Sequence, residues 1–123
     1  MENITLQAIY RDEVIFESKG KWLFPIFDLE NFLLSNHFEL ADIKVQDKVV
    51  GKAAALLFIH LGIGYVQGEI MSELAKEALG DAGIPYSYNV LVKQINCKTE
   101  KLLFDINDAN IAYTMLGKLA GRF

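Results

Sequence analysis

The sequence contains a single cysteine, only two histidines and no long run of basic or of apolar residues. One thiol, Cys97, cannot form an internal disulfide, which is typical of a protein from a reducing compartment. The longest apolar stretch, 53–59, is too short to span a bilayer. The N-terminal residues lack the basic and apolar segments of a signal peptide. We therefore expect a cytoplasmic protein without a membrane partner.

Positive charge is also scarce, since 12 basic residues stand against 16 acidic ones and the formal net charge is −4. Nucleic-acid binding depends largely on lysine and arginine side chains that meet phosphates. We therefore do not expect a nucleic-acid partner. The 123 residues, 52% of them hydrophobic, fit one domain, residues 1–123, that is large enough to fold without disulfides or metals.

Short β-branched and aromatic runs alternate with segments of helical periodicity, in the order ββαβαβαβα. The expected strands span 5–10, 14–18, 42–45, 65–70 and 86–92, and the expected helices span 25–34, 47–62, 73–79 and 108–119. Strands that alternate with helices predict crossover connections and a parallel later part of the sheet, whereas the opening hairpin adds an antiparallel pair. The pattern predicts an α/β domain with one mixed sheet.

The segment 47–62 is the strongest predicted helix and is apolar on nearly all sides, which is typical of a buried helix. We expect Asp47 to cap its N-terminus and Gly51 to lie inside its first turn. Ser72 is expected to cap the next helix in the same way.

The phrase DKVVGKAAALL at 47–57 resembles a prokaryotic family of uncharacterised proteins, DUF1893, assigned to the cytidine-deaminase-like fold. VIFES at 14–18 and the stretch 84–92 support the resemblance, which covers about Ile4 to Asn96. Lys98 follows Cys97 where the family often has proline, so the tail departs from the pattern. The resemblance implies a cytidine-deaminase-like three-layer sandwich, with a five-stranded mixed sheet and helices on both faces.

Zinc deaminases hold their metal through a histidine or cysteine at one helix start and two cysteines at the next. The corresponding positions here read Val50-Gly51-Lys52 and Met71-Ser72-Glu73-Leu74, and neither includes such ligands. His37 and His60 have no spacing that resembles a zinc site. We therefore expect no metal, no cofactor and no zinc-dependent deaminase activity. His60 is interpreted as a residue near the end of its helix, where a positive charge is favourable. A reactive thiol at Cys97 is the less favoured interpretation of that residue.

The start of the second helix is the candidate binding site, because ligands of open α/β sheets bind where parallel strands end. A helix N-terminus offers free amides and a positive dipole to an anion. The predicted site residues are Asp47, Lys48, Gly51, Lys52, Glu69 and Ser72. In the alternative interpretation, Gly51 serves close helix packing and the lysines are a solvated edge.

Three functions from different classes follow. The first is binding of a nucleotide-type or other anionic small ligand at this helix start. The second is a homo-oligomeric interaction or structural protein, favoured by the aromatic residues Trp22, Phe24, Phe27 and Phe38 around the first helix. The third is a metal-free enzyme with Asp47 as base and Lys52 as electrophilic stabiliser.

Overall fold

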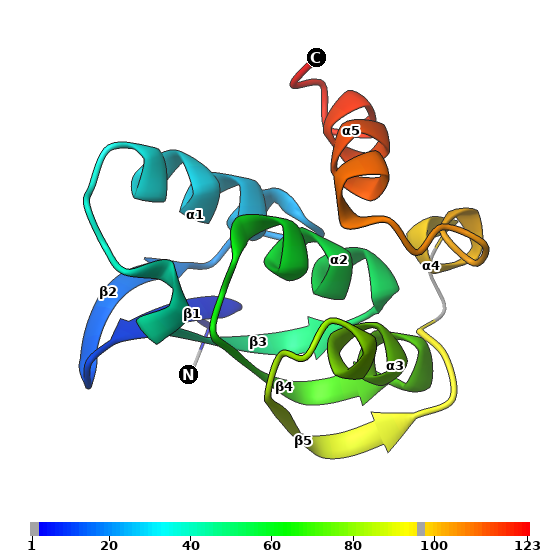
Figure 1. Cartoon of the computed structure of the whole chain (residues 1–123), viewed down its shortest axis with the longest axis horizontal. Coiled ribbons are helices and arrows are strands. Elements are labelled where there is room, and N and C mark those ends of the chain that lie inside the picture. The colour runs from blue at the N-terminus through cyan, green and yellow to red at the C-terminus, as the bar shows by residue number, and fades with distance from the viewer. Residues whose placement is uncertain (1–2, 96–97) are drawn as a thin grey trace.

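The computed structural model describes residues 3–95 and 98–123, which form one five-stranded mixed sheet with helices (Figure 1). The strand order is β2-β1-β3-β4-β5. Strand β1 is antiparallel to both of its neighbours, whereas β3, β4 and β5 are mutually parallel. The strands are β1 (Leu6–Tyr10), β2 (Glu13–Ser18), β3 (Ile43–Val50), β4 (Tyr65–Ser72) and β5 (Tyr86–Val92). The predicted mixed five-stranded sheet is confirmed.

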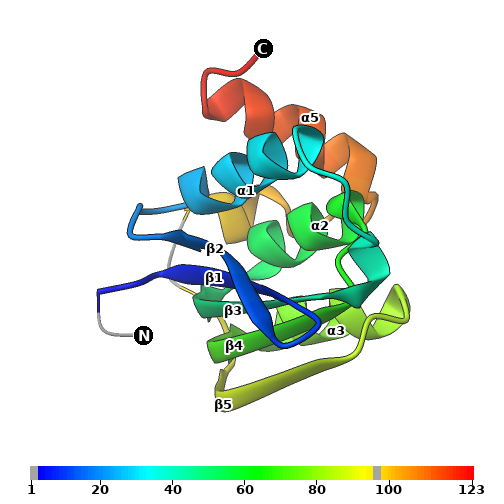
Figure 2. The same cartoon turned by 90° about the vertical axis from the view of Figure 1, so that its left-hand side faces the viewer.

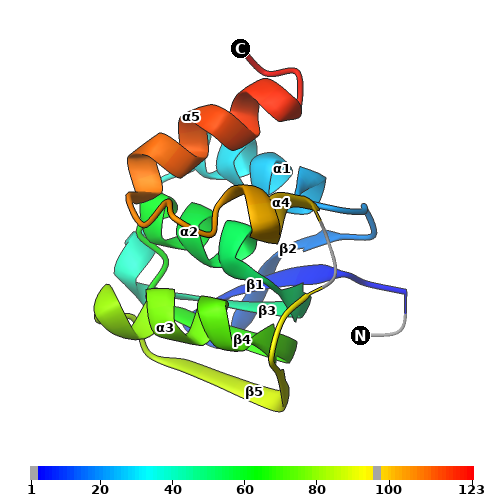
Figure 3. The same cartoon turned by 90° about the vertical axis from the view of Figure 1, so that its right-hand side faces the viewer.

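The described helices form two layers above the sheet (Figures 2 and 3). Three of them pack on the strands, and the C-terminal helix lies over these as an outer layer, so the chain is consistent with a three-layer sandwich. The helices are α1 (Phe24–Leu34), α2 (Lys52–Leu61), α3 (Glu73–Asp81), α4 (Lys98–Leu102) and α5 (Ala109–Leu119), with a 3₁₀ turn at Leu40–Asp42.

The expectation of helices on both faces of the sheet is corrected, because all described helices lie on the same side. Each parallel connection, β2 to β3, β3 to β4 and β4 to β5, advances in one direction along the sheet. Right-handed crossovers that advance in one direction place their helices on one face. The other face carries polar residues such as Gln46 and Gln67, whose side chains are hydrogen-bonded at 3.4 Å.

The core lies between this sheet and α2. Alternate residues of the central strands, such as Leu6, Ala8, Ile43 and Val45, point towards the helices and are fully buried. Helix α2 is buried from Lys52 to Phe58 because the sheet, α1, α3 and α5 surround it. The prediction of a buried central helix is confirmed.

The boundary between β3 and α2 differs from the prediction. Asp47 lies within β3, where it pairs with Leu6 of β1 and Gly68 of β4, so it does not cap the helix. Helix α2 begins at Lys52, and Gly51 is its extended N-cap residue. Strand pairing on both sides extends β3 to Val50, and this tertiary contact overrides the local capping signal.

Candidate functional site

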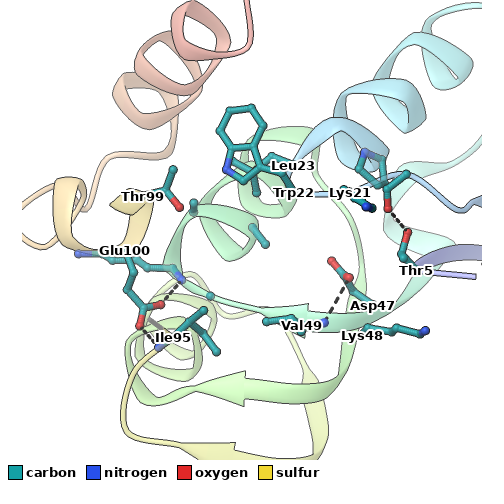
Figure 4. A pocket seen from close by; sticks show the side chains of 16 residues that line it. Thr5, Lys21, Trp22, Leu23, Asp47, Lys48, Val49, Ile95, Thr99 and Glu100 are labelled. Atoms are coloured by element: carbon teal, nitrogen blue, oxygen red, sulfur yellow. Dashed lines mark hydrogen bonds between the residues drawn. The ribbon is translucent and has the colours of Figure 1, made fainter. Parts of the chain in front are cut away.

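A cavity of about 360 Å³ lies where β3 ends and α2 begins (Figure 4). Its walls are mostly apolar, and the loop before α1 and the segment around α4 close it from two sides. Such positions, at the carboxyl ends of parallel strands, are the usual ligand sites of α/β sheets. The lining residues are Thr5, Gly20, Lys21, Trp22, Leu23, Pro25, Asp47, Lys48, Val49, Gly51, Lys52, Ala53, Ala54, Ile95, Thr99 and Glu100.

Glu100 of α4 occupies the N-terminus of α2, which the sequence predicted as an open anion site. The Glu100 residue is only 3% exposed. Its Oε2 accepts from the Lys52 amide at 2.9 Å and from the Ser72 hydroxyl at 2.8 Å, and its Oε1 accepts from the Ile95 amide at 2.6 Å. The chain therefore supplies its own anion to the first amide of α2, and this buried carboxylate joins three separate segments.

Gly51 allows this contact. A Cβ atom at Gly51 would lie 2.9 Å from Glu100 Oε2 and 3.4 Å from Ile95 Cγ1. Its backbone, with a φ of −91°, is ordinary extended chain, so space and not conformation requires glycine. The close approach at Gly51 is therefore made by Glu100 of the same chain.

We expect Gly51→Ala to lower the free energy of unfolding by about 1–2 kcal/mol, because Glu100 must move away from its donors. Urea denaturation measures the change. Gly80→Ala is the matched control, since a Cβ atom there meets nothing within 4 Å and alanine is the better helix former. Equal stability of the two variants would contradict the requirement for glycine at position 51.

Lys52 is buried, and its ammonium group binds a backbone carbonyl of the same chain. Its Nζ donates to the carbonyl of Phe104 at 2.9 Å. Burial lowers the pKa of Lys52, while the carboxylates of Glu77, Asp105 and Glu100 oppose that effect. The ammonium group of Lys52 is therefore held by a backbone carbonyl, whereas the enzyme hypothesis assigns it to a substrate.

Asp47 lies at the cavity, with its carboxyl group directed to the Val49 backbone of β3 (Figure 4). Burial raises its pKa to about 7, and the backbone amides of Val49 and Lys48 oppose the shift. The Val49 amide donates to Oδ1 at 3.4 Å. Near neutral pH this carboxyl group can therefore donate or accept a hydrogen bond.

The remaining predicted site residues are only partly brought together. Lys48 lines the cavity beside Asp47. Ser72 is buried, accepts from the Ala75 amide at 3.1 Å and thus caps α3 as predicted. Glu69 lies inside β4, which continues to Ser72, and its exposed side chain is not part of the cavity wall. The expectation that Glu69 ends its strand beside the site is corrected.

Most of the cavity residues were not predicted as part of the site, and Glu100 and Trp22 are the two most informative of them. Glu100 is 48 positions from Lys52, and its surroundings looked like a polar tail. Trp22 lies in the loop before α1, has a positive φ of 56° and is 44% exposed. A positive φ is strained for a bulky residue, and such strain is most often retained at functional sites. No local pattern pointed to either residue.

The other candidates lie elsewhere. His60 is near the end of α2, as expected, where its Nδ1 pairs with Asn110 Oδ1 at 2.8 Å and its ring stacks on Tyr113. Phe27 is buried and Phe38 packs on Tyr10, whereas Trp22 and Phe24 are exposed. Cys97 lies outside the described residues.

The described residues contain no group of three or more histidine, cysteine, aspartate or glutamate side chains that could hold a metal ion. Over the same part of the chain, no helix has the length and apolarity needed to cross a bilayer. The fold and the cavity define an α/β protein with a mixed five-stranded sheet.

The comparisons with known proteins name the family. The model of the family "Domain of unknown function (DUF1893)" matches residues 2–119, so the chain belongs to DUF1893. A crystal structure of a DUF1893 family protein from Thermotoga maritima is similar, with a TM-score of 0.81 and 25% identity over 94% of this chain and 80% of that one. No curated protein matches the chain. The cytidine-deaminase-like label stays an expectation.

Proposed function

We propose that this protein binds a small ligand of nucleotide type in the cavity beside Asp47. The observation that carries the proposal is a carboxyl group with a pKa near 7 in a mostly apolar cavity at the end of a parallel strand. Ligand sites combine apolar walls with a few placed polar groups, and titrating residues with shifted pKa values are concentrated in them.

The walls suit a flat, largely apolar body such as a nucleobase. Leu23, Pro25, Val49 and Ile95 provide apolar surface, and the exposed Trp22 ring stands at one side (Figure 4). Stacking of a base on an aromatic ring contributes about 1–3 kcal/mol. Asp47 supplies the hydrogen-bonding group that fixes the orientation of such a ring.

The charges restrict where a phosphate group would bind. Glu100 already accepts from the Lys52 amide, so the first amide of α2 is not open to an anion. Ala53 and Ala54 also line the cavity. Lys21 and Lys48 add positive charge to the lining. A phosphate is therefore expected on the side of these two lysines and away from Glu100.

The proposal is tested by native mass spectrometry of the purified protein, followed by calorimetric titration with purine and pyrimidine nucleosides and their monophosphates. We expect Asp47→Asn and Trp22→Ala each to weaken binding at least tenfold, because each removes a group that faces the ligand. Glu69→Gln, on the uncovered face of the sheet, is the control and is expected to bind as the wild type does. Absence of binding to all these compounds, or equal binding by all variants, would refute the proposal.

A further inference from the structure

Strand β5 forms one edge of the sheet, and no described segment pairs with its outer side. Its seven residues, YSYNVLV, include no charged residue and no proline, and its pairing with β4 continues without a shift in register. Tyr88 and Val90 are 37% and 51% exposed. Natural edge strands usually carry charges, prolines or bulges that prevent pairing with another chain.

The opposite edge of the sheet has such protection. Strand β2 carries Glu13 and Glu17, and its pairing with β1 is interrupted by a bulge between Ala8 and Ile9. The β2 edge of the sheet is therefore protected against pairing with another chain, whereas the β5 edge is unprotected and suited to such pairing.

We propose that β5 pairs antiparallel with β5 of a second copy of this chain, which would join two sheets into one of ten strands. The strand is self-complementary when the two-fold axis passes through its central residue, Asn89. Tyr88 then lies opposite Val90 of the second copy, and Tyr86 lies opposite Val92. Pairs of an aromatic and a β-branched residue are among the favourable cross-strand neighbours.

Charged residues of α3 lie beside the strand. Helix α3 packs on β4 and β5, and its Lys76 lies over the Tyr88 ring at 5.8 Å. The two α3 helices would run antiparallel on the same side of the joined sheet. Each α3 begins at Glu73, so its acidic first turn offers a partner to Lys76 of the other copy. A second copy thus supplies the strand that this edge accepts.

Sedimentation velocity over a wide range of protein concentrations gives the first test. We expect a monomer–dimer equilibrium whose dissociation constant increases at least tenfold in Val90→Lys, because the new ammonium groups oppose pairing of this edge. Val14→Lys, at an equally exposed position of β2, is the control and should leave the equilibrium unchanged. Circular dichroism checks that both variants are folded.

Engineered cross-linking tests the register. In a C97S background, N89C should form a disulfide-linked dimer under mild oxidation, since residues directly opposite in antiparallel strands have Cα atoms about 4.5–5.5 Å apart. V14C, under the same conditions, should not. A strict monomer at all concentrations, a dimer unaffected by Val90→Lys, or no faster cross-linking by N89C than by V14C would each overturn the proposal.

Discussion

Glu100→Ala is expected to lower the free energy of unfolding by about 3–5 kcal/mol, the largest effect that we predict for a single side chain. The substitution leaves the amides of Lys52 and Ile95 and the hydroxyl of Ser72 without their acceptor. Leaving a buried donor without its charged acceptor lowers the stability by more than the net contribution of the hydrogen bond, because water cannot replace the acceptor. Urea denaturation with tryptophan fluorescence measures the change.

A second measurement separates this role from simple loss of packing. Ser72 donates to Glu100 while it caps α3 through the Ala75 amide, so the two residues act together. In a double-mutant cycle with Ser72→Ala, the two effects should be non-additive by about 1 kcal/mol. Lys101→Ala, at the exposed next position of α4, is the control. Additive effects, or a loss in Glu100→Ala no larger than in the control, would contradict the structure.

Asp47 should make the stability of the wild-type protein fall as pH rises from about 4 to about 7. Its pKa is raised from 3.8 to about 7 in the folded chain, so the folded state holds a proton that the unfolded state has already lost. The stabilising contribution is complete below the unfolded pKa and is lost as pH rises through the folded pKa. Three pK units correspond to about 4 kcal/mol, and partial access of water to the group reduces this to an expected value of about 2 kcal/mol.

Asp47→Asn removes this titration and leaves the shape of the side chain nearly unchanged. We expect the variant to gain about 2 kcal/mol relative to the wild type between pH 4 and pH 8, measured by urea denaturation at several pH values. Glu69→Gln, at an exposed position of β4, should show no such gain. The same relative stability of Asp47→Asn at both ends of this range would show that the carboxyl group titrates as it does in water.

These two side chains also show how binding and stability are related in this cavity. Burial of Asp47 is unfavourable once the carboxyl group is ionised, and a ligand that donates a hydrogen bond to it would offset part of that cost. Glu100 is fully paired and stabilises the junction of α2, α3 and the segment after β5. Asp47 is therefore suited to bind a ligand, and Glu100 stabilises the wall of the cavity.

Much of the fold could be predicted from local patterns. The strand at 86–92 was predicted with the bounds that the structure shows, and the predicted cap of α3 by Ser72 is made by a hydrogen bond from the nearby Ala75 amide. Such features depend on residues within a few positions of one another, so the sequence contains the information in readable form. The short helix α4 had no clear apolar periodicity and was missed.

The structure has a cavity at the junction that the sequence predicted as the candidate site, but the expected role of Asp47 as a helix cap is wrong. The order of strands and helices placed the cavity at the end of β3, because ligand sites follow from topology. The local sequence predicted Asp47 as a helix cap, but its pairing with Leu6 on one side and Gly68 on the other keeps it in strand β3.

The sequence by itself determined the α/β class and the buried central helix, since these depend on periodicity and residue types. Only the tertiary structure decided that Glu100 fills the start of α2, that Lys52 turns to Phe104, and that Trp22 stands at the cavity. The physical reason is that these contacts join residues tens of positions apart. The packing of helices and strands determines which residues meet, and a local sequence pattern does not predict these contacts.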